Sequence, residues 1–230
     1  QMAGLKSTQL SGLTTTQLGA FDSAQLAGIT TTALSGISTT NLAAITTTQM
    51  AGLTSTQLGN LTTAQMSNLT GAQLAAFTTT QLAGFTASQL AALTTTLSGN
   101  LTSTELGALT TTQLGGLKAA NITALTTTQL SGLTSAQVGA LTVSTQVPAL
   151  TSTHLGALTT TQLDGMTSAQ VGALTTTQGS TLTTTQLASL TTTQMAGFKS
   201  TQLSGLTTTQ LGGFDSAQIA AITTSALSGL

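Results

Sequence analysis

Charged and aromatic side chains are nearly absent from this chain of 230 residues, at 3% and 2% of the sequence. Typical domains carry roughly 25% charged residues, so the composition is not that of an ordinary globular domain. The formal net charge of −1 provides no electrostatic attraction to nucleic acid or to anionic lipid. No apolar run approaches the roughly 20 residues of a membrane-spanning helix, and we expect neither a membrane span nor a nucleic-acid partner.

Cysteine is absent as well, which leaves the redox compartment unmarked and is compatible with a secreted bacterial protein. The sequence begins at Gln1 without an initiator methionine or a signal peptide, so we expect it to be an excerpt of a longer protein. Apolar residues make up 39% at regular spacing. That is enough to bury a core, and it argues against disorder.

What the chain does contain is an eight-residue module, exemplified by residues 125–132 (LTTTQLSG), repeated from end to end. Thr126 and Gln129 have the spacing of a capping box, in which each side chain satisfies a backbone N–H at a helix start. Leu125 and Leu130 have the spacing of a hydrophobic staple. Gly132 follows where a helix can stop through a left-handed residue. The octad therefore predicts one short helix.

Other secondary structures fit the octad less well. Its apolar positions, one and six, are five and then three residues apart, which places them on opposite faces of a strand. In one continuous helix the apolar pair would rotate by roughly 80° per octad, so no stripe would form. We therefore predict an all-α repeat solenoid of very short Thr-capped helices, one per octad. Because Thr has β propensity, a β-solenoid with 16-residue coils is the alternative.

The octad register runs from Leu5 to Leu141, gains one residue within 141–148, and resumes from Leu150 to Leu230. Two further octads lose the pattern without changing length, at 94–97 and 178–181. We interpret these three places as bulges or kinks in a single uninterrupted array over residues 1–230. Residues 1–37 return nearly unchanged as 194–230, which indicates a longer repeat within a longer parent protein.

A second period of sixteen residues lies on the first. Threonine octads, with Thr at position three, alternate with small-residue octads, which have Ser, Ala or Gly there; Thr39 and Thr184 are exceptions. This alternation predicts two octads per coil, with each kind on its own flank. Duplication history could produce the same alternation. All ionisable residues except Asp164 lie in small-residue octads, so one flank would be an uncharged Thr surface suited to lateral packing or a solid surface.

No candidate catalytic, cofactor-binding or metal-binding residue emerges. His154 takes the place of the capping Gln and is interpreted as a surface substitution, because a lone His without Cys makes a poor metal or catalytic site. Glu105 occupies the same position, where Glu caps as well as Gln does. Met50, Met66 and Met195 stand where Leu usually stands, which indicates core filling and not haem ligation. We expect no enzyme and no cofactor.

The remaining charges occupy the N-cap position of their octads. Asp22 and Asp215 suit both capping and the helix dipole, whereas Lys6, Lys118 and Lys199 cannot cap. Lys6 and Asp22 are sixteen residues apart, as are Lys199 and Asp215. One coil apart on one flank, each pair is expected to form an exposed ion pair worth about 0–1 kcal/mol.

Octads such as 133–140 (LTSAQVGA) and 21–28 (FDSAQLAG) resemble the octapeptide-repeat arrays of very large proteobacterial secreted proteins, known as adhesins or as "haem utilisation or adhesion" exoproteins. The resemblance extends over essentially the whole chain. It implies a secreted, fibre-like protein of the cell surface, with no functional residues to carry over. The haem part finds no support, because His154 is the only histidine.

These observations predict a structural extracellular repeat protein that forms a fibre or an adhesin stalk at a bacterial cell surface and self-associates into fibres or bundles. Stacked repeats of this kind bury a continuous apolar core, and each depends on its neighbours. The alternative is a binding module that recognises ice, polysaccharide or another regular solid with its uncharged Thr flank. An even Thr ladder, which that alternative requires, is a feature that a β-solenoid provides more readily.

Overall fold

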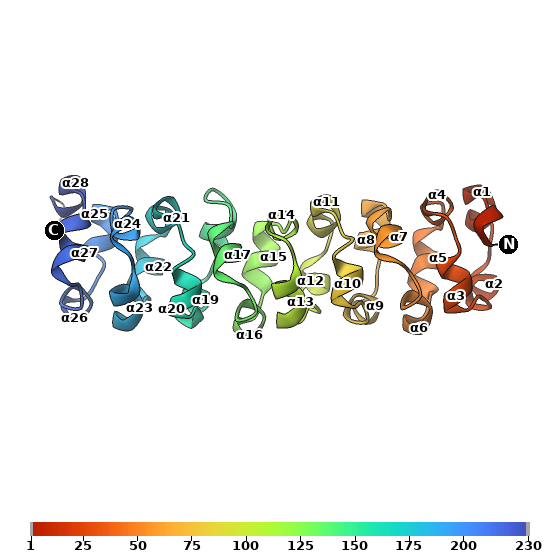
Figure 1. Ribbon diagram of the computed structural model, residues 1–230, viewed down its shortest axis with the longest axis horizontal. Coiled ribbons are helices and arrows are strands. Elements are labelled where there is room, and N and C mark those ends of the chain that lie inside the picture. The colour runs from red at the N-terminus through yellow and green to blue at the C-terminus, as the bar shows by residue number, and fades with distance from the viewer. Residues whose placement is uncertain (1, 229–230) are drawn as a thin grey trace. The chain divides into compact units, whose positions relative to one another are not determined.

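The computed structural model describes residues 2–228 and contains only helices among them: 28 short α-helices and one 3-10 helix. Each octad forms one α-helix of four to six residues (Figure 1), so the predicted all-α fold is confirmed and the β-solenoid alternative is not supported. The chain divides into two compact units, Gln1–Leu117 and Lys118–Leu230. The octad pattern continues on both sides of that division, and a single uninterrupted array stays a prediction.

The first unit contains η1 and α1 to α14, in the order η1 Met2–Gly4, α1 Ser7–Ser11, α2 Thr15–Gly19, α3 Ser23–Ala27, α4 Thr31–Leu34, α5 Thr39–Ala44, α6 Thr47–Met50, α7 Ser55–Gly59, α8 Thr63–Ser67, α9 Gly71–Ala75, α10 Thr79–Leu82, α11 Ala87–Ala91, α12 Thr95–Ser98, α13 Ser103–Ala108 and α14 Thr111–Leu114.

The second unit contains α15 to α28, in the order α15 Ala119–Ala124, α16 Thr127–Leu130, α17 Ser135–Gly139, α18 Gln146–Ala149, α19 Ser152–Ala157, α20 Thr160–Leu163, α21 Ser168–Ala173, α22 Thr176–Ser180, α23 Thr184–Ser189, α24 Thr192–Met195, α25 Ser200–Leu203, α26 Thr208–Leu211, α27 Ser216–Ala221 and α28 Thr224–Leu227.

The predicted capping box starts nearly every helix. In α16 the Gln129 backbone N–H donates to Thr126 Oγ1 at 3.2 Å, and the Thr126 N–H donates to Gln129 Oε1 at 2.8 Å. Asp22 replaces Thr in α3 and accepts in the same way. At the three Lys caps the Lys side chain accepts no bond, and only the bond from the Lys backbone N–H to the amide oxygen three residues later remains; that amide belongs to Gln202 at Lys199 and to Asn121 at Lys118.

The helices do not stop as expected. None of the described residues has a positive φ, glycine included, so the predicted left-handed stop at Gly132 is wrong. Instead Ser131 keeps φ −61° and ψ −19°, and the last turn tightens through i→i−3 bonds from Gly132 N–H to the Gln129 carbonyl and from Leu133 N–H to the Leu130 carbonyl. The next octad then starts in extended backbone. Because no left-handed residue is needed, the backbone conformation at position eight admits Ala as well as Gly.

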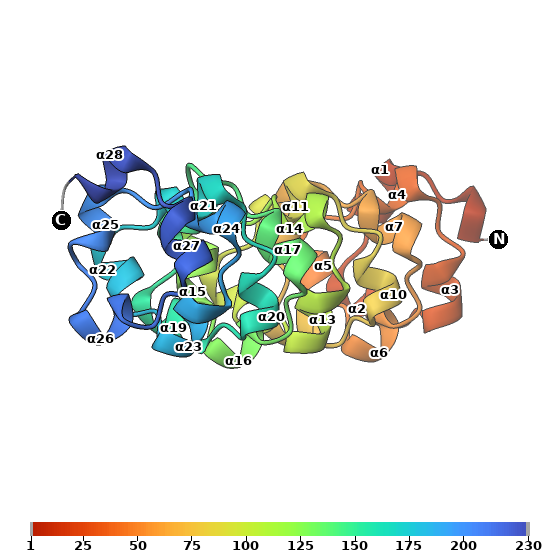
Figure 2. The ribbon, with the colours of Figure 1, turned by 60° about the vertical axis from the view of Figure 1, so that its left-hand side comes forward.

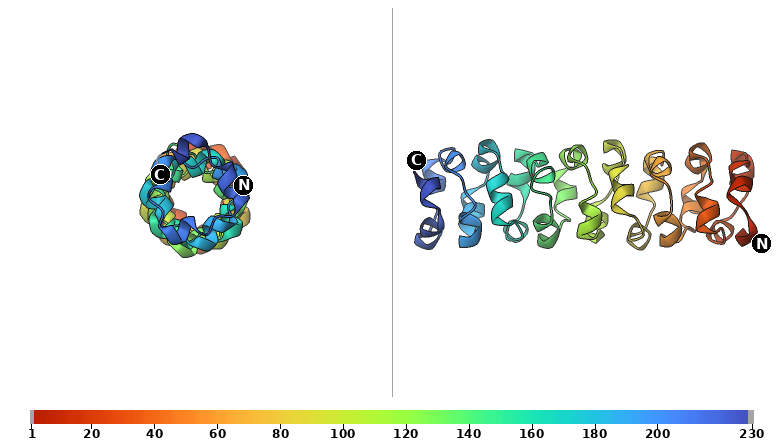
Figure 3. Two further views of the ribbon diagram at one scale, coloured as in Figure 1. Left: turned by 90° about the vertical axis from the view of Figure 1, so that its left-hand side faces the viewer. Right: turned by 90° about the horizontal axis from the view of Figure 1, so that it is seen from above.

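Positions one and six form the core, as the staple predicts: Leu125 is 3% and Leu130 2% exposed. Met50, Met66 and Met195 are fully buried at position six, which confirms the core-filling interpretation. Positions two, three and four lie on the outside and present Thr and Ser. The order of the helices within each unit is also seen in Figure 2, and Figure 3 shows that the helices of the second unit follow one another around a ring.

Successive turns are longer than predicted. In the first unit α1 packs on α4, α2 on α5 and α3 on α6, and in the second unit α24 packs on α27 in the same three-helix step. The Gln57 side chain donates to carbonyls 28 and 31 residues earlier, at Ile29 and Leu26. One turn therefore takes about 28 residues, three and a half octads, and the predicted 16-residue coil of two octads is wrong.

The sixteen-residue alternation has a packing cause. Gly84, at position eight of a threonine octad, lies against Ser55, at position three of the small-residue octad three octads earlier; a Cβ on Gly84 would overlap the Ser55 carbonyl oxygen. Gly165 lies on Ser135 in the same way. Because three is an odd number, every such contact joins octads of unlike kind. Other pairs of this type are Gly36 with Ser7, Gly52 with Ser23, Gly116 with Ala87 and Gly197 with Ser168.

The predicted division into two flanks is therefore wrong. Octads of one kind are sixteen residues apart, which is more than half of a 28-residue turn, so neither kind forms a flank of its own. Lys6 and Asp22, at the N-caps of α1 and α3, are two octads apart, whereas α1 packs on α4. Lys199 and Asp215 are likewise displaced, since α25 packs on α22 and α28. The pairs do not stand in stacked octads.

Of the three irregular places, only one distorts the chain. The helices α12 and α22 are regular and begin at Thr caps, so no bulge or kink forms at residues 94–97 or 178–181. The extra residue at 141–149 does produce the predicted irregularity. There α18 starts only at Gln146, and its N-terminal neighbour Thr145 has φ −132° and ψ −48°.

Candidate functional site

The most specialised side chains of the molecule are the glutamines at position five, which we call the glutamine row. Gln162 of α20 is 5% exposed. Its Oε1 accepts from the Thr159 backbone N–H at 3.0 Å, and its Nε2 donates to the carbonyl oxygens of Leu130 at 2.9 Å and Leu133 at 2.8 Å. One amide thus caps its own helix and binds the turn before it.

Glutamine suits this place because its amide carries an acceptor and two donors on one planar group. Burying a polar group without partners is unfavourable, and among the described residues no buried side-chain nitrogen or oxygen lacks a partner. The row repeats with little change: Gln186 Nε2 donates to Leu155 and Leu158, and Gln194 Nε2 donates to Leu163 and Met166, all within 2.7–2.9 Å.

The row is the main polar connection between successive turns. Within each unit, the backbone–backbone hydrogen bonds of the described residues reach back no more than five residues, so none joins one turn to the next. A few hydroxyl groups add to the row, such as Thr123 Oγ1, which donates to the Ala149 carbonyl at 2.9 Å. Sequence reasoning recognised the cap made by Oε1 and missed the second bond, made by Nε2.

His154 stands in the glutamine row and not on the surface, so its interpretation as a surface substitution is wrong. It is 5% exposed; its Nδ1 accepts from the Thr151 N–H at 3.2 Å, and its Nε2 lies 2.8 Å from the Leu125 carbonyl. A carbonyl oxygen cannot donate, so the network assigns the proton to Nε2. The imidazole therefore makes the accepted bond of the glutamine amide and one of its two donated bonds, and both nitrogens are engaged with the backbone.

Glu105 caps its helix, as predicted: its Oε2 accepts from the Thr102 N–H at 2.6 Å, with the side chain 7% exposed. Glutamate has no amide nitrogen, so it cannot make the Nε2 bond by which a glutamine would reach the Phe77 carbonyl of the previous turn, 28 residues earlier. Leu97, in the preceding octad, also lacks an amide. The first unit thus has two consecutive octads, α12 and α13, without the Nε2 bond of the row.

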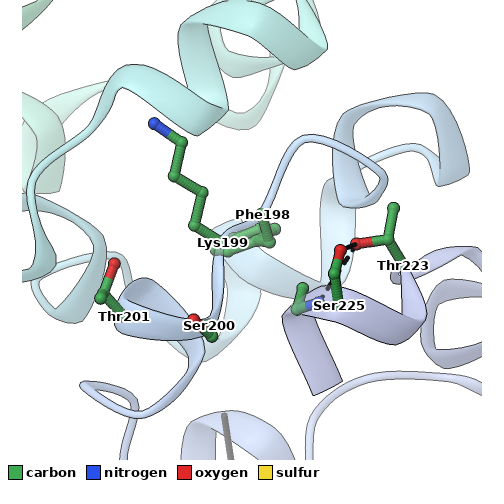
Figure 4. Close-up of a pocket in the computed structure, with 7 residues that line it drawn as sticks. Phe198, Lys199, Ser200, Thr201, Thr223 and Ser225 are labelled. Carbon is green, nitrogen blue, oxygen red and sulfur yellow. Dashed lines mark hydrogen bonds between the residues drawn. The ribbon is translucent and has the colours of Figure 1, made fainter. Parts of the chain in front are cut away.

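A hollow in the second unit marks another gap in the row. It is lined by Phe198, Lys199, Ser200, Thr201, Thr223, Ser225 and Ala226 (Figure 4). Ala226 stands at position five, 28 residues after Phe198, so the hollow lies where a glutamine side chain would extend. Thr223 and Ser225 hydroxyls are 3.2 Å apart, and the Lys199 ammonium extends away from them. Lys199 is the one charged residue of this hollow, and no acidic side chain lines the hollow with it.

The same Lys199 is the one charged residue of a second hollow, which is lined by Val143, Ser168, Ala169, Gly172, Ala173, Gly197 and Lys199. The described residues include no group of three or more His, Cys, Asp or Glu that could hold a metal ion. None of the helices in the described residues has the length and apolar character that a bilayer crossing requires. The expectation that the chain is no enzyme stays a prediction.

Comparison with known families gives one match. Residues 106–143 and 147–184, together about a third of the chain, match the family model of the ALTTAQ repeat. This chain is a repeat protein. The matched stretches contain Ala108 to Gln113 and Ala157 to Gln162, each reading ALTTTQ, and the break between them falls inside the nine-residue octad. No curated protein matches the chain. The match supports the repeat character that the resemblance to adhesin-type exoproteins implies, and it does not test the adhesin part of that resemblance.

Proposed function

We propose that this repeat protein is a structural spacer, part of an extracellular fibre or adhesin stalk at a bacterial cell surface. The observation that carries the proposal is the sameness of the repeats. From one octad to the next, the same positions form the cap, the core and the bond to the previous turn. The main regular change is the alternation between Thr and smaller residues at position three. A spacer needs length and a constant cross-section, and a stacked array supplies both by repetition.

The surface supports a spacer too. Thr and Ser cover the outside, and the eight ionisable residues are too few to recognise a charged partner at long range. The polar groups that could act chemically, the row amides and His154, are buried and engaged with the backbone. Such a chain offers neighbours a Thr and Ser surface with few charges, which suits side-by-side association of copies into fibres or bundles.

The alternative, binding of ice or polysaccharide by an even Thr ladder, has less support. Each helix lies over the junction between two helices of the previous turn, because a turn holds three and a half octads. The Thr side chains of consecutive turns are therefore staggered by half an octad.

Two experiments test the spacer. Antibodies against the chain should label intact producing cells and lose that label after mild surface proteolysis; labelling only after permeabilisation would contradict an extracellular location.

Removal of residues 158–213, seven octads or two whole turns, should shorten the fibre without changing attachment. A matched removal of residues 158–209 breaks the octad register and should disrupt the array. If the 158–213 variant abolished attachment, the deleted octads would be a binding surface and not a spacer.

A further inference from the structure

We infer that the array is an extensible tether, which opens turn by turn under an axial load and closes again when the load falls. This mechanical function rests on the proposed spacer role, since a load reaches the chain only if it links two attached bodies.

The first reason is connectivity. Within the second unit α20 packs on α17 in one direction and on α23 in the other, and the first unit repeats this pattern in α10, which packs on α7 and α13. Each turn is thus held by the turn before it and the turn after it. Within each unit the main helix contacts of the described residues join helices three apart along the chain, so a force applied to the ends of such a coil passes through its turns in series.

The second reason is the kind of bond between turns. Within each unit, no backbone hydrogen bond of the described residues crosses from turn to turn. The junction under α20 is held by the two bonds of Gln162 Nε2, at 2.9 and 2.8 Å, and by the apolar contacts of buried residues such as Leu163. These bonds join consecutive turns, so an axial load separates them a few at a time. A sheet pulled in shear resists with a whole ladder at once.

The third reason is that the helix start is specified locally. The bonds between Thr159 and Gln162 lie within one octad, so an opened octad keeps the residues that restart its helix. Helices of four to six residues do not persist alone, and an opened turn becomes extended chain. At about 3.3–3.6 Å per residue, a turn of 28 residues would extend to about 90–100 Å.

The row also indicates where opening begins. In the first unit α12 and α13 are consecutive octads that lack the Nε2 donor, because Leu97 and Glu105 occupy position five. Two neighbouring junctions are weakened there, so this segment is the expected first internal point of opening. Regular junctions, such as the one at Gln162, should follow at higher force.

Optical tweezers on the whole 230-residue chain, held at its two ends, test the tether. We expect several opening steps, each of one turn or a small multiple, with closing at nearly the same force. A single rip that releases the whole chain would overturn the inference. Glu105→Gln adds a donor and should raise the force of the first step, whereas Gln162→Leu should create a new early step. Thr161→Ala, on the exposed face beside Gln162, is the matched control and should change neither.

The variants keep the test decisive even if Gln162→Leu folds poorly, because Glu105→Gln restores the common residue. A first step insensitive to Glu105→Gln would overturn the role of the row. The two proposals fail separately. Chains that rip in one step yet label on the cell surface would be rigid stalks, and chains that open turn by turn yet remain inside cells would be tethers without the extracellular role.

Discussion

The regular octad of α20 and the nine-residue octad of α18 form the same capping box with different spacing between the cap and the glutamine. In α20 the cap is Thr159 and the Gln is three residues later; in α18 the cap is Thr142 and Gln146 is four residues later. Both boxes have the same bond lengths, 3.0 Å to the side-chain amide oxygen and 3.2 Å to the Thr hydroxyl. The extra residue is placed outside, where Val143 is 41% exposed.

The bonds between turns keep their partners in spite of the insertion. Gln170 reaches back across the inserted residue to Leu141 and Val138, at separations of 29 and 32 residues, whereas Gln178 reaches Leu150 and Val147 at 28 and 31. In both cases the partners are positions one and six. The comparison teaches that the contacts between turns determine the register, and that the segment between cap and glutamine adjusts to them.

The largest effect should come from an insertion on the wrong side of the glutamine. One Ala between Gln162 and Leu163 rotates Leu163 by about 100° out of the core and should cost about 3–5 kcal/mol. One Ser between Thr160 and Thr161 copies the nine-residue octad and should cost less than about 1 kcal/mol, because the box can stretch as at Thr142. Urea unfolding measures both, and equal losses would refute the comparison.

Next comes the close approach of turns. Gly165→Ala forces a Cβ onto the Ser135 carbonyl and should cost about 1–3 kcal/mol through overpacking. At Gly156 the nearest atom to an added Cβ is the Thr181 carbonyl oxygen at 3.8 Å, so Gly156→Ala should be neutral or stabilise by up to about 1 kcal/mol through helix propensity. Thermal unfolding should show shifts of opposite sign.

The row itself should rank third. In Gln162→Leu the new side chain fills similar space but makes no hydrogen bonds. The Thr159 N–H and the Leu130 and Leu133 carbonyls lose their bonds to Gln162, which should lower the free energy of unfolding by about 1–3 kcal/mol. Thr161→Ala on the exposed face should stay within about 0.5 kcal/mol. Hydrogen exchange at α17 and α20 should rise only in the first variant; equal exchange in both would mean that the row does not hold the turns together.

Replacements within the row should have smaller effects of predictable sign. Glu105→Gln supplies the missing donor for the Phe77 carbonyl and should stabilise by about 1 kcal/mol. His154→Gln should change stability little, because the imidazole already makes the cap bond and one bond to the previous turn. Denaturant unfolding midpoints of the two variants measure these changes. A lower midpoint for Glu105→Gln would show that position five does not need a hydrogen-bond donor.

Removal of the extra residue should matter least. Deletion of Ser144 returns the octad to the spacing of α20, and because the box is already made with normal bonds, stability should change by less than about 0.5 kcal/mol. Deletion of Thr161 from the regular octad is the counterpart. There no spare residue exists, so the cap should be lost and stability should fall clearly below that of the Ser144 deletion.

The features found correctly from the sequence lie within one octad. Thr126 with Gln129 and Leu125 with Leu130 are separated by three and five residues, and a capped short helix needs nothing more distant. The turn length, the burial of His154 and the absence of a left-handed stop were missed. The alternation of Gly at position eight with small residues at position three carries a signal for an odd packing step, whereas the alternation at position three by itself predicts two flanks.

By itself the sequence determined where each helix begins, which residues form the core and that one helix forms per octad, because those interactions close within eight residues. Only the tertiary structure decided that a turn holds three and a half octads, that Gly84 must lack a side chain against Ser55, and that glutamines at position five, such as Gln81, bond the preceding turn. The physical reason is distance along the chain. The partners of these groups lie about 28–31 residues away, and their identity depends on how the helices stack and not on any local pattern.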